Sequence, residues 1–303
     1  MNISAEKYMI FEINKNVTKD NRPYLRVVLT DKEGGQHNGI MFDSNKLEFD
    51  PEKGDVVAVD AVVQNYNGQL QLKISNMKKL ENESRIDFLP KTKYNIQDMV
   101  TEIKTILDSE IKDSNIKKLV NLFFGDSKTL KLFKYMPAAK NIHHAYVGGL
   151  LEHTLSVVKL AVKMADYYSA YVNKDLLLVG ALFHDVGKIF ELNAEKGFDY
   201  TDQGKLIGHL LLGIELVNGY ISEIEQFPSE YKYIIGHMIA SHHGLLEFGS
   251  PKKPKTVEAL ILHFIDDMDA KINTFNTIFG KEDIDSGWSS YDRLLERQLY
   301  KHY

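Results

Sequence analysis

The spacing of the apolar residues changes once along this 303-residue chain, and the change limits the folds it can adopt. Between Tyr8 and Leu80 apolar residues mostly alternate with polar ones, as in 25–29 and 55–63, which is the period of β-strands. From Ile96 onward they recur every three or four residues, which is the period of α-helices. The sequence therefore predicts a β domain followed by a helical domain, and the chain is long enough for two cores.

Turn signals divide residues 1–82 into about five short strands. One of them, Asn67-Gly68, is typical of a tight hairpin. Five strands in this length fit an OB-fold, a five-stranded Greek-key barrel whose face and loops often bind oligonucleotides; another small barrel of the SH3 kind is the alternative. Residues 1–90 carry 12 basic and 14 acidic side chains, so affinity for nucleic acid would depend on stacking rather than on net charge. The aromatic candidates for such stacking, with barrel packing as the alternative, are Tyr24, Phe42 and Tyr66.

The rest of the chain is predicted as a linker and a helical region. Residues 83–95 are polar and contain Pro90, which is typical of a linker. The helical region then covers 96–303, with its core at about 140–280. At its end, the leucines of 288–303 have helical spacing and favour packing or a contact between subunits of a homo-oligomer.

Composition excludes several classes of protein. The chain has no cysteine, so disulfides and thiolate metal sites are excluded, and histidine and carboxylate remain as the metal ligands. The formal charge of −5 excludes a strong general attraction for nucleic acid. No apolar run approaches the ~20 residues of a membrane span, and the first twenty residues lack the apolar core of a signal peptide. We expect a soluble, cytoplasmic protein with no membrane partner.

Several predicted helices carry histidine or aspartate beside positions that should be buried. Projected at 100° per residue, His153 falls on the apolar face of its helix with Leu150 and Val157. The pair His184-Asp185 directly follows an eight-residue apolar run. Further candidates of the same kind are His209, His237, His242, His243, Asp266, Asp267 and Asp269.

A divalent cation explains this pattern best. Burying so many imidazoles and carboxylates without a partner would cost a large desolvation energy, which a cation offsets. Imidazole with carboxylate suits Mn²⁺, Fe²⁺, Co²⁺, Ni²⁺ or Zn²⁺ better than Mg²⁺. We expect one or two ions, with Mn²⁺ as the first choice. The residues alone leave open which members of the two groups 237/242/243 and 266/267/269 bind them.

In order along the chain, His153, His184-Asp185, His209, His242 and Asp266 resemble the signature of the HD-domain superfamily, metal-dependent phosphohydrolases with an all-helical fold. The segments 148–154, 184–188 and 241–244, together with the OB-like domain, resemble more narrowly the bacterial YhaM-type 3′-to-5′ exoribonucleases. This resemblance covers nearly the whole chain.

The resemblance also implies roles for individual residues. One ion would be held by His153, His184, Asp185 and Asp266, and a second, sharing Asp185, by His209 and His242. Asp185 and Lys188 would be catalytic. Lys188, one turn from the His-Asp pair, would steady a phosphate oxygen or help the leaving group, and a solvated lysine at a helix end is the alternative. The candidates for substrate binding are Tyr24, Phe42, Tyr66, His143, His144, Lys188, His243, Lys252 and Lys253, the last two in a basic loop with Lys255.

The favoured hypothesis is a metal-dependent 3′-to-5′ exoribonuclease that hydrolyses single-stranded RNA by metal-activated water, with single-stranded DNA as a second substrate. A strand-binding module beside a hydrolase favours it, because such a module raises the local substrate concentration. The alternatives are an HD-type nucleotide or cyclic-nucleotide phosphohydrolase, and a nucleic-acid-binding replication or regulatory protein with a structural metal.

Overall fold

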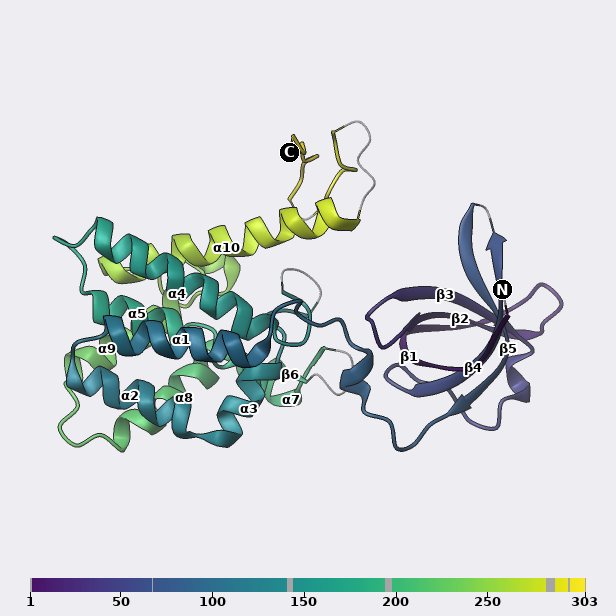
Figure 1. Ribbon diagram of the computed structural model, residues 1–303, viewed down its shortest axis with the longest axis horizontal. Coiled ribbons are helices and arrows are strands. Elements are labelled where there is room, and N and C mark those ends of the chain that lie inside the picture. The colour runs from purple at the N-terminus through teal and green to yellow at the C-terminus, as the bar shows by residue number, and fades with distance from the viewer. Residues whose placement is uncertain are drawn as a thin grey trace. The chain divides into compact units, whose positions relative to one another are not determined.

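The computed structural model describes residues 2–66, 68–140, 144–193, 198–281, 287–293 and 295–302. Its contacts divide the chain into two compact units (Figure 1). The first, called here the barrel unit, comprises Met1–Lys91 with Asn193–Asp199. The second, the helical unit, comprises Thr92–Leu192 with Tyr200–Tyr303.

The barrel unit contains five strands that close into a barrel in the order β1-β2-β3-β5-β4. Neighbouring strands are antiparallel except β3 and β5, which are parallel. This order confirms the predicted OB-like barrel. The strands are β1 (Asn2–Val17), β2 (Pro23–Thr30), β3 (Gln36–Phe42), β4 (Val56–Tyr66) and β5 (Gln69–Lys79), with 3₁₀-helices at Ser44–Lys46 and Arg85–Phe88.

The first strand closes the barrel because it bends. Its register shifts between Ile10 and Glu12 in the pairing with β2, and between Ile3 and Glu6 in the pairing with β4. Such bulges let one strand turn from one neighbour to the other. Alternate residues of the strands then fill the interior, so the sequence alternation places the barrel core.

The helical unit contains ten α-helices among its described residues. Side chains at the N-caps, such as Asn95, Asp113 and Asn173, accept hydrogen bonds from the first backbone N–H groups of their helices. The helices are α1 (Ile96–Glu110), α2 (Ser114–Gly125), α3 (Ser127–Tyr135), α4 (Gly149–Tyr167), α5 (Lys174–Phe183), α6 (Lys188–Glu191), α7 (Asp202–Ile207), α8 (His209–Ser222), α9 (Ser229–Ser241) and α10 (Val257–Lys281), with a 3₁₀-helix at Leu246–Phe248.

Helix α5 forms the centre of this unit. All of its residues from Leu176 to Phe183 are buried, and they pack against α4, α9 and α10. A helix that is apolar on every side must be covered on every side. Its C-terminal end, where the polar pair His184-Asp185 follows, therefore lies in the interior. None of the described helices is both long and apolar enough to cross a membrane.

Helices α7 and α8 are separated at Gly208, which has φ 80°. One part of the helical prediction was wrong. In 287–293 and 295–302 the chain forms bridges between Trp288 and Tyr300 and between Asp292 and Arg297, not a helix. Here backbone groups pair across the segment rather than four residues apart, so the leucine spacing was misleading. The chain also forms a two-stranded sheet, β6 (Leu192–Asn193) with β7 (Asp199–Tyr200).

Candidate functional site

The ends and inner faces of five helices bring histidine and aspartate side chains together inside the helical unit. Four of these residues are buried, and His209 and Asp266 are half-buried. The set consists of His153 in α4, His184 and Asp185 after α5, His209 at the start of α8, His242 after α9, and Asp266 in α10.

Two of the histidines are oriented by the helices that precede them. His184 donates from Nδ1 to the carbonyl of Ala181 at 2.9 Å, and His242 donates from Nδ1 to the carbonyl of Ile239 at 2.9 Å. The last carbonyls of a helix lack partners within the helix, so each imidazole caps its own helix end. The Nε2 atom of each ring is then left without a proton and faces the cluster.

Four donor atoms form what we call the first cluster: His153 Nε2, His184 Nε2, Asp185 Oδ2 and Asp266 Oδ1. His153 Nε2 lies 3.1 Å from both His184 Nε2 and Asp266 Oδ1. Asp185 Oδ2 lies 3.7 Å from His153 Nε2 and 3.5 Å from His184 Nε2. His184 Nε2 and Asp266 Oδ1 are 3.7 Å apart.

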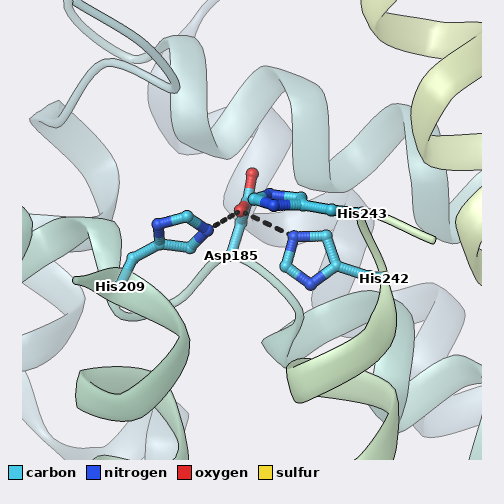
Figure 2. Close-up of side chains that lie close together, drawn as sticks. All are labelled: Asp185, His209, His242 and His243. Atoms are coloured by element: carbon cyan, nitrogen blue, oxygen red, sulfur yellow. Dashed lines mark ion pairs between the residues drawn. The ribbon is translucent and has the colours of Figure 1, made fainter. Parts of the chain in front are cut away.

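The other oxygen of Asp185 belongs to a second cluster. Asp185 Oδ1 lies 3.6 Å from His209 Nε2 and 3.4 Å from His242 Nε2 (Figure 2). These three atoms are buried, and none of them has a hydrogen-bond partner among the described residues. A buried polar atom without a partner is costly, so three that face one another indicate a missing ligand.

The spacing of both clusters fits divalent metal ions. Two donors that each lie about 2.1 Å from an ion are separated by about 3.0–3.4 Å, depending on the coordination angle. The distances between donors, 3.1–3.7 Å in the first cluster and 3.4–3.6 Å in the second, lie within this range or up to about 0.3 Å above it. The residues present would thus fit two divalent ions, one at each cluster, with one oxygen of Asp185 available to each.

Protonation in the metal-free protein differs between the two imidazoles of the first cluster. Burial lowers the pKa of His184 to about 4, so this ring is neutral near pH 7. Burial acts in the same direction on His153, but hydrogen bonds to Asp266 and Asp269 raise the pKa of His153 to about 10. An ion entering the first cluster must therefore displace a proton from His153.

Lys188 is a half-buried cation at the same site. Its Nζ lies 2.6 Å from Asp185 Oδ2, one turn of chain away. Burial would lower the pKa of Lys188, but the charge and hydrogen bond of Asp185 raise it above the ordinary value, while the pKa of Asp185 is held well below its ordinary value despite burial. Lys188 is thus a charged residue at the cluster, not a solvated one.

Two carboxylates in contact with the clusters were not assigned from sequence. Asp269 Oδ2 accepts a hydrogen bond from His153 Nδ1 at 2.7 Å, and Glu191 Oε1 accepts one from His209 Nδ1 at 3.0 Å. Asp269 was a candidate ligand only, and its spacing of three residues from Asp266 was the available signal. For Glu191 the sequence carries no comparable signal.

The remaining candidates in the helical unit lie in different surroundings. His144 is buried and donates from Nε2 to Asp269 at 3.1 Å. His243 lies beside the second cluster, with its ring centroid 5.1 Å from that of His209 (Figure 2). His237 is engaged elsewhere, because its Nε2 accepts from the backbone N–H of Lys255 at 2.9 Å. His143 lies outside the described residues, and Lys252 and Lys253 are exposed on the loop before α10.

In the barrel unit, the three predicted aromatic residues line one open groove of about 910 Å³. Tyr24 and Phe42 are direct cross-strand partners on β2 and β3, with ring centroids 5.8 Å apart. Tyr66 lies at the end of β4 and is 61% exposed. The basic side chains in the lining are Lys19, Arg26 and Lys73, and the one acidic side chain in the lining is Glu12.

Comparison with known protein families gives two matches, both within the helical region of the chain. The family model of the HD domain matches residues 150–271, which extend from α4 into α10 and contain every residue of the two clusters. A second family model, described as "Putative helicase", matches residues 94–176. The helical unit therefore contains an HD domain.

For the barrel, a similar solved structure is the second OB-fold domain of replication protein A from Methanococcus maripaludis, determined in solution. It is 18% identical over 25% of this chain and 82% of that chain, with a TM-score of 0.21. Because this score is low, the strand order alone supports the OB-like description.

Proposed function

We propose that this chain, whose residues 150–271 form an HD domain, is a divalent-metal-dependent 3′-to-5′ exonuclease of single-stranded RNA, with single-stranded DNA as a second substrate. The observation that carries this proposal is the carboxylate of Asp185, which offers one oxygen to each of two donor clusters. A pair of ions sharing one carboxylate suits the hydrolysis of phosphodiester bonds.

The chemistry follows from the donor set. Bound at the two clusters, divalent ions would supply Lewis-acid stabilisation to a phosphate and activation of water. Imidazole and carboxylate together favour Mn²⁺ or a similar transition-metal ion over Mg²⁺.

The chain's own residues have distinct tasks in this proposal. Asp185 would orient both halves of the site, and Lys188 holds its Oδ2 by a hydrogen bond of 2.6 Å. Lys188 keeps a positive charge beside Asp185, where it would bind an oxygen of the scissile phosphate. His243 lies next to the second cluster and would contact the substrate from that side.

The groove of the barrel unit supports a strand as the substrate. Tyr24, Phe42 and Tyr66 offer faces on which bases can stack, and Arg26 lies 5.8 Å from the ring centroid of Tyr24. Three basic side chains and one acidic side chain line the groove, although the domain as a whole is slightly acidic. Local charge and stacking would together bind single-stranded nucleic acid.

Other parts of the proposal rest on resemblance. The 3′-to-5′ direction and the preference for RNA come from the likeness of the motifs to YhaM-type exoribonucleases. The match of residues 94–176 to a helicase family agrees with a nucleic-acid substrate. A guiding role for Lys252 and Lys253 at the substrate entrance stays a prediction.

The test is a cleavage assay on the full chain. The protein is stripped with chelator, Mn²⁺ is added back, and a 5′-labelled single-stranded RNA is followed beside the same RNA with a blocked 3′ end. We expect a ladder that shortens from the 3′ end, absent for the blocked RNA and for Asp185→Asn. The matched control is Asp267→Asn, because Asp267 is an exposed carboxylate of α10 that pairs with Lys271.

The outcomes separate the alternatives. Cleavage of mononucleotides or cyclic nucleotides without cleavage of RNA would replace the proposal by a nucleotide phosphohydrolase. RNA binding without hydrolysis in any metal, with an unfolded Asp185→Asn variant, would indicate a structural metal in a binding protein.

A further inference from the structure

The four histidines of the clusters differ in what holds the ring nitrogen that faces away from the cluster. Two of them, His184 and His242, donate from Nδ1 to a backbone carbonyl of their own helix. The other two, His153 and His209, donate from Nδ1 to a carboxylate. Each cluster therefore contains one histidine whose Nδ1 donates to a carboxylate, His153 in the first cluster and His209 in the second.

Asp269 holds His153 within a network of hydrogen bonds in which the carboxylate of Asp269 is the acceptor. Its Oδ2 accepts from His153 Nδ1 at 2.7 Å and from His144 Nε2 at 3.1 Å, and its Oδ1 accepts from the hydroxyl of Ser156. His144 Nδ1 lies 2.8 Å from the hydroxyl of Tyr146, which holds the other side of the ring. The carboxylate of Asp269 thus accepts all three hydrogen bonds, including the one from His153.

The backbone reinforces this network. His144 is buried and has φ 50°, a strained value for a residue with a side chain, and its backbone N–H donates to Asn273 Oδ1 at 3.0 Å. Asn273 is one turn beyond Asp269 on α10, so a single helix fixes both His144 and His153.

Glu191 holds His209 by a simpler arrangement. Its Oε1 accepts from both the ring Nδ1 and the backbone N–H of His209, each at 3.0 Å. The same oxygen thus fixes the start of α8 and the rotation of the ring that α8 carries. The Glu191 side chain is only 12% exposed, so water competes little for these bonds.

We propose that Asp269 and Glu191 are positioning residues for two different ions, Asp269 for the ion of the first cluster and Glu191 for the ion of the second. A carboxylate behind a ligating imidazole fixes the tautomer and makes the ligating nitrogen more basic, and its loss typically weakens metal affinity by about 10–100-fold. Because each cluster has one such pair, the two affinities are set separately. The inference rests on the proposed function in one respect, namely that both clusters bind ions.

The experiment is a calorimetric titration of the metal-free full chain with Mn²⁺. Asp269→Asn and Glu191→Gln keep the size of the side chain and remove its charge. We expect each to weaken one of two binding steps by about 10–100-fold and to leave the other unchanged. Asp269→Glu, which keeps the carboxylate, should recover part of the lost affinity, and Asp267→Asn on the same helix should change neither step.

Variants of direct ligands assign the steps. Asp266→Asn removes a donor of the first cluster, so the step that remains should respond to Glu191→Gln and not to Asp269→Asn. Thermal unfolding of each metal-free variant shows whether it is folded. If Asp269→Asn does not fold, Ser156→Ala and His144→Gln, which weaken the hold on Asp269, should still lower the affinity of the first step alone.

The inference would be overturned by unchanged isotherms in both carboxylate variants, or by equal weakening of both steps by either variant. A wild-type chain that binds fewer than two ions would overturn it as well. If the steps respond as expected but no oligonucleotide is cleaved, the proposed function fails and this inference holds. If RNA is cleaved and the isotherms do not change, the proposed function holds and this inference fails.

Discussion

At the scale of single residues, Lys188 offers a direct test of the site's electrostatics. Replacing it by Met removes the half-buried cation 2.6 Å from Asp185 and should lower kcat on RNA by about 10²-fold, because a donor aimed at developing charge is lost. The metal content should not fall, since Lys188 is not a ligand. The measurement is single-turnover cleavage with metal analysis of the same sample.

Two controls accompany this variant. Lys188→Arg keeps the charge and should retain part of the activity, and Lys271→Met removes an exposed lysine of α10 and should have no effect. An unchanged kcat for Lys188→Met would show that the residue serves only to neutralise Asp185.

The three aspartates of α10 show how far a residue's role can be predicted from its position. The sequence offers Asp266, Asp267 and Asp269 as equivalent ligands. Positions three apart share a helix face, so 266 and 269 belong together and 267 points elsewhere. Only the structure shows that Asp266 faces Nε2 of His153 while Asp269 faces Nδ1 of the same ring.

At the scale of elements, the corner between α2 and α3 depends on one carboxylate. Asp126 accepts hydrogen bonds from the backbone N–H groups of Lys128 and Thr129 and from the hydroxyls of Thr129 and Tyr220. Asp126→Ala should lower the free energy of unfolding by about 1–2 kcal/mol at pH 7, because it removes the N-cap of α3. Urea unfolding measures the loss.

Asp126 also makes the stability of the fold depend on pH, and the direction of this dependence follows from its lowered pKa. The hydrogen bond from Thr129, aided by that from Tyr220, holds the pKa of Asp126 below its ordinary 3.8 despite the opposing effect of burial. The unfolded chain therefore takes up the proton first, so charged Asp126 stabilises the fold above about pH 4, and this contribution is lost as the pH falls further.

Asp126→Asn isolates this contribution because asparagine is an equally good N-cap. It should be less stable than the wild type at pH 7 and approach it by pH 3. A stability gap of the same size at both pH values would contradict this explanation.

The elements that periodicity predicted best are those with a strong pattern. The alternation of β2 and the apolar run of α5 predicted how these elements are buried. A strand of a barrel is buried on one face, and a helix at the centre of a bundle is buried on every side. The division at Gly208 and the bridges of the C-terminal segment depend on single backbone angles and on pairing across the segment. The spacing of apolar residues indicates neither the backbone angle of a single residue nor the pairing across a segment.

At the scale of the whole molecule, the proposal divides the work between a unit that binds the strand and a unit that cleaves it. Tyr24→Ala or Phe42→Ala should each weaken the binding of single-stranded RNA by about 5–100-fold, the value of one base–aromatic stack. The rate on a dinucleotide at saturation should stay unchanged, because the clusters lie in the other unit. Fluorescence anisotropy and cleavage of the two substrates measure the two effects.

The matched control is Tyr233→Ala, which removes a 72% exposed tyrosine from α9, outside the groove. If it weakens binding as much as the groove variants do, the groove is not the binding surface. If all three variants bind normally, the barrel has another role.

The class of each domain and the residue types of the site were predictable from the sequence, because periodicity is a local property of a segment. The sequence predicted a barrel, a helical bundle and a set of inward histidines and aspartates. It did not predict that Asp185 faces two clusters, that Asp269 supports His153 from 116 positions away, or that a slightly acidic domain has a basic, aromatic groove. These features depend on contacts between distant segments, and such contacts exist only once the chain has folded.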